Sequence, residues 1–144
     1  MRIATIAALA GVCAVTATAQ SSDQLPGKLS GRWTVTSPRG TFIDTVSFTF
    51  ESNGTPGPVT GKLTFRGVSC GAQDEPLKGT WDGSELRFES THRPNVNAQR
   101  MDGQCGTGKV IYVLRRNPRE KTFEGEGRPG EGASGSTVSI TVSP

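Results

Sequence analysis

The only histidine of the chain, His92, is the residue best suited to acid–base chemistry. An imidazole titrates near neutral pH, so it can both accept and donate a proton under ordinary conditions. Arg93 follows it directly, and Arg100 and Asp102 come soon after. We expect His92 to be an exposed loop residue, because the spacing indicates no Ser-His-Asp or Cys-His arrangement. The alternative is a lyase or isomerase site in which His92 acts as acid or base and an arginine holds an anionic group.

The cysteines predict a single disulfide. Cys13 lies in the apolar N-terminal segment, which we expect to be removed, so Cys70 and Cys105 are left to pair. Closing that loop of about 36 residues restricts the unfolded chain by roughly 4 kcal/mol. The alternatives are two free thiols or a metal site, although neither cysteine has a Cys or His neighbour at zinc-ligand spacing.

The sequence favours neither a cofactor nor a metal. Residues 125–130 match the pattern G-x-G-x-x-G, but the segment after them predicts a strand, whereas a dinucleotide requires a helix there. No set of three metal ligands is evident. Removal of Arg2 from the 16 basic residues leaves 15 against 13 acidic ones, and the signs are interspersed. This balance does not indicate a nucleic-acid partner.

The N-terminus has the features of a secretory signal. Residues 3–15 form an apolar run after Arg2 that is too short to span a bilayer, and Ala17 and Ala19 are small residues suited to signal peptidase. We expect a cleaved signal peptide at 1–19, a leader at 20–28 and one domain at 29–144. The alternative is a membrane anchor. The expected location is secreted, either periplasmic or extracellular, with no membrane association.

From Gly31 onward, apolar and polar residues alternate with the period of a β-strand. Turn-forming pairs such as Asp82-Gly83 separate the alternating segments, and no candidate helix intervenes. The pattern therefore predicts an all-β fold, an antiparallel eight-stranded up-and-down barrel, with a β-sandwich as the alternative. The eight predicted strands cover residues 31–36, 45–50, 59–66, 77–81, 85–89, 109–114, 123–127 and 138–142.

Long connections follow the third, fifth and seventh predicted strands, at 68–76, 92–108 and 128–135. In an up-and-down barrel they share one end, which also receives Cys70, Cys105 and His92, and binding sites commonly lie among such loops. Four inward glycines, Gly61, Gly79, Gly125 and Gly127, either let the strands bend or leave room for a ligand. The residues predicted to meet a small, partly apolar ligand are the aromatic ones Trp33, Phe48, Phe65, Trp81, Phe88 and Tyr112.

Two families resemble this chain at its first predicted strand. The Gly-x-Trp pattern in Leu29-Ser30-Gly31-Arg32-Trp33 resembles the opening of the lipocalin and avidin families. That resemblance implies a barrel holding a small, mostly apolar ligand, with the tryptophan packed at the closed end. The stretch from Ser21-Ser22 through Leu25-Pro26 to the same strand resembles the N-terminal trunk of periplasmic inhibitors of bacterial metalloproteases. It implies an alternative function, inhibition of a co-secreted protease by the N-terminal segment.

Overall fold

The computed structural model describes residues 24–37, 40–66, 73–92, 108–133 and 137–144. These residues form an all-β structure, and no helix occurs among them. The strands are β1 (Lys28–Ser37), β2 (Gly40–Phe50), β3 (Gly57–Arg66), β4 (Gln73–Trp81), β5 (Glu85–His92), β6 (Gly108–Asn117), β7 (Thr122–Pro129) and β8 (Val138–Ser143).

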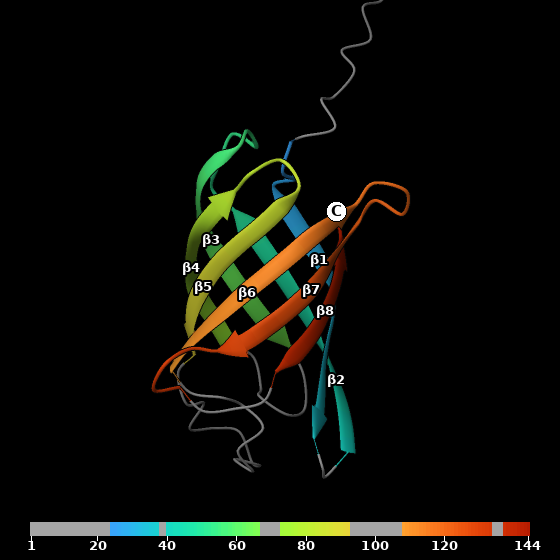
Figure 1. Ribbon diagram of the computed structural model, residues 1–144, viewed down its shortest axis with the longest axis vertical. Coiled ribbons are helices and arrows are strands. Elements are labelled where there is room, and N and C mark those ends of the chain that lie inside the picture. Colours follow the sequence, from blue (N-terminus) through green and yellow to red (C-terminus); the bar gives the residue numbers. More distant parts are fainter. Residues whose placement is uncertain (1–23, 38–39, 67–72, 93–107, 134–136) are drawn as a thin grey trace, which may run out of the picture.

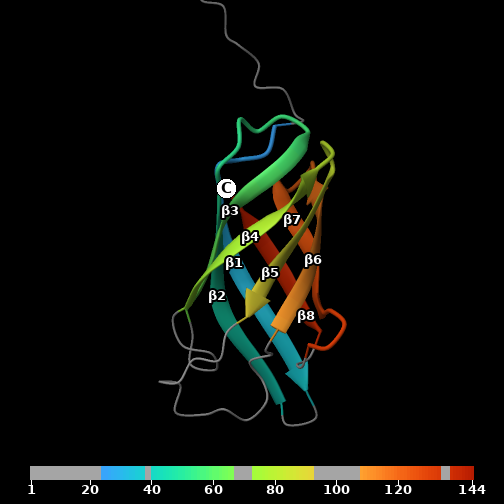
Figure 2. The same ribbon diagram turned by 90° about the vertical axis from the view of Figure 1, so that its left-hand side faces the viewer.

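The eight strands close into one barrel (Figure 1). Each strand pairs antiparallel with the next, and β8 pairs with β1, for example Trp33 with Ile140. The predicted up-and-down barrel is confirmed, since a sandwich would leave two separate sheets. The view from the side shows the tilted strands wrapping around a single interior (Figure 2).

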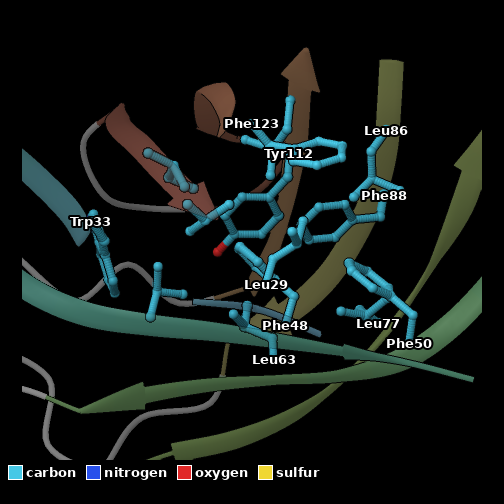
Figure 3. Packing of buried hydrophobic residues seen from close by; sticks show 14 of the residues in the cluster. Leu29, Trp33, Phe48, Phe50, Leu63, Leu77, Leu86, Phe88, Tyr112 and Phe123 are labelled. Atoms are coloured by element: carbon cyan, nitrogen blue, oxygen red, sulfur yellow. The ribbon is translucent and has the colours of Figure 1, made fainter. Parts of the chain in front are cut away.

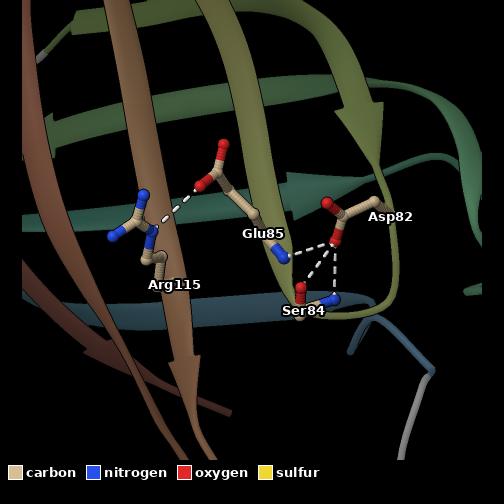
Figure 4. Close-up of polar contacts among 4 residues, drawn as sticks. All are labelled: Asp82, Ser84, Glu85 and Arg115. Atoms are coloured by element: carbon tan, nitrogen blue, oxygen red, sulfur yellow. Dashed lines mark hydrogen bonds and ion pairs between the residues drawn. The ribbon is translucent and has the colours of Figure 1, made fainter.

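The two ends of the barrel differ in their connections. We call the end with the β2–β3, β4–β5 and β6–β7 connections the turn end, and the opposite end the loop end. The predicted Asp82-Gly83 turn is confirmed at the turn end, where Gly83 has a positive φ angle of 103°, and Gly54 in the β2–β3 connection has one of 81°. Asp82 stabilises its turn by accepting hydrogen bonds from the Ser84 amide (2.8 Å), the Ser84 hydroxyl (2.9 Å) and the Glu85 amide (2.6 Å) (Figure 4).

The interior is packed with aromatic side chains (Figure 3). In the middle of the barrel, Phe88 stacks on Tyr112 with ring centroids 4.7 Å apart, and Phe48 meets Phe88 edge-on at 5.1 Å. At the turn end, Trp81 contacts Phe123 at 5.8 Å. All five side chains are buried, so these rings fill the described middle and turn end.

The predicted inward glycines serve the packing of the strands. A Cβ atom at Gly61 would overlap the backbone carbonyl oxygen of Thr49, and one at Gly79 would overlap that of Arg87, so neighbouring strands approach closely at both positions. At Gly127 a Cβ atom would lie 2.7 Å from the ring of Tyr112. Close packing against neighbouring strands accounts for these glycines, a role that differs from both the bending and the ligand space predicted from the sequence.

The N-terminal segment contributes to the core. Leu25 is buried, and its amide donates a hydrogen bond of 2.7 Å to the carbonyl of Gly54. Two residues later, the carbonyl of Gly27 accepts one of 2.9 Å from the Phe50 amide. This stretch lacks strand periodicity, but these two hydrogen bonds hold it against the turn end of the barrel. The first strand, β1, then begins at Lys28.

Candidate functional site

The polar side chains that are fully buried in the described part of the barrel lie near the loop end, whereas at the turn end Arg116 is half-buried, with its guanidinium 6.0 Å from the centroid of the Phe123 ring. The buried polar or charged residues are Asp44, Glu75 and Ser90, which are 6%, 3% and 2% exposed. They lie on β2, β4 and β5, toward the end of each strand that meets the loop end. Burial of a carboxylate costs several kcal/mol unless hydrogen bonds and charges compensate it, so their concentration at one end marks this region as different from the rest of the core.

Ser90 connects β5 to the polar part of β4. Its hydroxyl lies 2.9 Å from the carbonyl oxygen of Pro76 and 3.2 Å from Oε2 of Glu75. Since a hydroxyl has one proton, it donates to one of these oxygens at a time, and its own lone pairs can accept from another group. The Glu75 carboxylate supplies further acceptor sites. Together, Glu75 and Ser90 form a buried hydrogen-bonding pair on adjacent strands.

Tyr112 brings a hydroxyl to the same end from β6. Burial raises the pKa of this phenol well above its usual value, and the negative charge of Glu75 raises it further. The hydroxyl is therefore neutral at physiological pH and able to donate a hydrogen bond. In the core view its oxygen points toward the side of the cluster on which Trp33 lies (Figure 3).

An aromatic wall accompanies these polar groups. Trp33 on β1 and Phe65 on β3 have ring centroids 4.3 Å apart at an interplanar angle of 58°, and both are buried. Trp33 pairs with Asp44 across β1 and β2. The position that the lipocalin resemblance implies for this tryptophan, at the closed end, is wrong here, because Trp33 lies past the middle of β1 on its way to the loop end.

The structure separates the six predicted ligand-contacting aromatic residues into three levels. Trp33 and Phe65 lie toward the loop end, and the Tyr112 ring packs with Phe48 and Phe88 in the middle. Trp81 lies beside the Asp82 turn at the other end. The middle rings separate Trp81 from the polar residues, so the six do not surround one common space.

The predicted acid–base site falls largely outside the described residues. Arg93, Arg100 and Asp102 lie there, as do Cys70 and Cys105, so the site and the disulfide stay predictions. The backbone of His92 is described, and it is the last residue of β5, paired with Gly108. The signal peptide at 1–19 also lies outside the described residues.

The polar interior residues were missed because the predicted strands were too short. The expected loop 68–76 is wrong in its second half, where residues 73–76 begin β4, and β2 starts five residues earlier than expected. Neither extension was predicted, because proline has no amide proton for a strand ladder and aspartate is rare in strands. Pro76 and Asp44 therefore argued against strands at these positions. The alternation itself could have located these residues. Two positions before Val46 and Leu77 lie Asp44 and Glu75, and two positions after Phe88 lies Ser90.

Comparison with protein-family models, with curated proteins and with solved structures gives no match to this chain. Among the described residues, no group of three or more histidine, cysteine, aspartate or glutamate residues is placed to hold a metal ion. The same part of the chain contains no helix long and apolar enough to cross a membrane.

Proposed function

We propose that this protein is a secreted carrier that binds a small, partly apolar ligand inside the loop end of its barrel. The observation that carries the proposal is the uneven interior: the fully buried polar side chains of the described barrel lie at the loop end, and aromatic packing occupies the middle and the turn end. Binding sites for small molecules combine apolar walls with a few convergent polar groups. Trp33 and Phe65 supply such a wall, and Glu75, Ser90 and Tyr112 supply the polar groups.

The packing limits where the ligand can lie and how large it can be. The rings of Phe48, Phe88 and Tyr112 form a floor across the barrel, with centroid distances of 4.7 to 6.3 Å. A ligand resting on this floor occupies only the loop half. Its apolar part meets the aromatic wall, while a hydrogen-bond donor on it would reach Glu75 or an acceptor would reach the Tyr112 hydroxyl.

The predicted signal peptide and disulfide fit the same proposal. Cys70 and Cys105 belong to the β3–β4 and β5–β6 connections, both of which leave the barrel at the loop end. A disulfide between them would join two connections that both begin at the loop end. The resemblance of the first strand to lipocalins and avidins favours the same class of function.

The two tryptophans provide a direct test, because the chain has one near each end of the barrel. We would screen a compound library, and 1-anilinonaphthalene-8-sulfonate as a first probe, against the protein from Gln20 onward. In the Trp81→Phe variant, Trp33 is the only emitter, and binding should change its emission. In the Trp33→Phe variant, Trp81 lies behind the aromatic floor, so its emission should stay constant.

The polar contacts are tested with the best compound from that screen. Glu75→Gln or Ser90→Ala should weaken binding about tenfold, which is the loss expected for one hydrogen bond of about 1.4 kcal/mol. The matched control is Glu120→Gln, on the exposed β6–β7 turn, which makes the same chemical change away from the site. The proposal fails if no compound alters Trp33 emission, or if the substitutions at positions 75, 90 and 120 act alike.

The lyase or isomerase alternative requires one further measurement on the same compound. After incubation with the protein, chromatography should return a carried ligand unchanged. Conversion of the compound, abolished by His92→Ala with little change in affinity, would replace the carrier proposal with an enzyme.

A further inference from the structure

The outer face of β6 carries two aliphatic side chains among charged neighbours. Ile111 and Val113 alternate with the buried Val110, Tyr112 and Leu114, so they point away from the barrel interior, and both are half-buried. Their partners on the adjacent strands carry charges on both sides of β6. A strand facing only water would normally present polar side chains at these positions. This aliphatic pair therefore gives the outer face of β6 a half-buried apolar patch.

Two hollows meet at the aliphatic pair. One, of about 640 Å³, is lined by Val113, Glu126, Arg128 and Pro129, and the other, of about 550 Å³, by Pro58, Thr80 and Glu89. Arg87 and Ile111 line both hollows, so together they form one groove across the outer face, which we call the β5–β7 groove. The first hollow includes Gly125 and the second Gly79, two positions at which neighbouring strands approach closely.

Arg87 differs from the other cations of this groove. The guanidinium of Arg115 pairs with Glu85 at 2.9 Å, that of Arg128 with Glu126 at 2.6 Å, and the Lys78 ammonium lies 3.6 Å from Glu89. Arg87 is exposed, and in the described part of the chain no ion pair engages it. The junction of the two hollows thus presents an available guanidinium beside an aliphatic patch.

We propose that the β5–β7 groove binds an extended peptide segment of a partner protein, one that carries an aspartate or glutamate two positions from a leucine, isoleucine or valine, because residues two positions apart in an extended chain share a face. The carboxylate would pair with Arg87, whose guanidinium suits bidentate contact, and the aliphatic residue would cover Ile111 and Val113. The negative charge of such a segment complements the positive charge of Arg87, and its aliphatic side chain complements the apolar pair Ile111 and Val113. Arginine is also among the residues that most often dominate interface energies.

The geometry favours a peptide over other partners. The groove runs from Pro58 on β3 to Pro129 on β7, four interstrand spacings or about 19 Å, which is the length of about six extended residues. Both hollows are open to solvent along this length, which suits a chain lying across the strands. Because β8 pairs with β1, the closed barrel offers no sheet edge across this face to which a peptide strand could add.

The test uses a library of random heptapeptides displayed on phage, selected on the protein from Gln20 onward. The selected peptides should share an acidic residue two positions from an aliphatic one. A synthetic copy of the best peptide should bind the Arg87→Gln variant at least tenfold more weakly, and Val113→Thr should also weaken it. The matched control is Arg32→Gln, an exposed arginine on the outer face of β1, which should bind like the wild type.

Thermal unfolding of each variant verifies that the substitution leaves the fold intact. Selected peptides without the acidic residue, or with equal affinity for Arg87→Gln and wild type, would overturn the proposal. So would a dimer in light scattering that Arg87→Gln dissociates, because the groove would then receive a second copy of this chain. This inference does not depend on the carrier function, since Arg87→Gln should leave the Trp33 response to its ligand unchanged.

Discussion

Leu25→Ala is expected to destabilise the barrel by about 2–3 kcal/mol. Leu25 is only 4% exposed, and truncation of a buried leucine to alanine costs 2–5 kcal/mol. We take the lower part of that range because the residue lies at the turn end of the barrel, where neighbours can relax toward the space it leaves. Its amide hydrogen bond to Gly54 is retained in the alanine variant, so the loss reflects the side chain alone.

The assay is thermal and denaturant unfolding of the protein from Gln20 onward. A domain of about 120 residues has an unfolding entropy of about 0.25 kcal/mol/K, so the midpoint should fall by about 10 °C. Gln24→Ala is the control: the exposed neighbour of Leu25 should shift the midpoint by less than about 2 °C. Equal behaviour of the two variants would show that the segment before β1 is not part of the folded core.

Three further outcomes are expected. Gly79→Ala should prevent folding or cost several kcal/mol in a denaturant titration, because its Cβ atom would collide with the backbone of β5. The control Gly27→Ala, at a position with open space around it, should be nearly neutral in the same titration. The hydrogen bonds to Asp82 hold the pKa of its carboxyl below the usual value, so this residue stabilises the fold above about pH 4 and loses this effect as the pH falls through the lowered pKa. Asp82→Ala should therefore reduce stability at pH 7, and the reduction should become smaller in acid. Cys70→Ser should lower stability by a few kcal/mol, and the unreduced wild-type protein should show no free thiol by mass spectrometry; two free thiols per chain would refute the predicted disulfide.

The barrel itself was predictable from local patterns. Val46, Phe48 and Phe50 alternate with polar residues, and pairs such as Asp82-Gly83 separate strands that are adjacent in sequence, so topology follows from the order of the strands. Each of these signals lies within a few residues of chain. The glycine positions were also recognisable, because an inward glycine in a strand has few structural roles.

The candidate site was less predictable, because its residues contradict the pattern that defines the strands. Asp44 and Glu75 occupy inward positions where the alternation rule expects apolar side chains, so sequence reasoning ended the strands before reaching them. Leu25 was assigned to a leader because nothing local shows that it folds back over the β2–β3 turn. Such contacts depend on tertiary structure, which a local pattern does not contain.

The pairing of β8 with β1 has a consequence for how the protein is made. Ser30 pairs with Ser143, so the hydrogen bonds that close the barrel join strands from opposite ends of the domain sequence. Contacts of such long sequence separation form late and slowly, since the connecting chain must first lose its freedom. An emerging chain therefore cannot complete the barrel before β8 is available, and until then β1 and β7 each lack a neighbour. Such delayed closure would make the chain dependent on protection of those two strand edges until folding is complete.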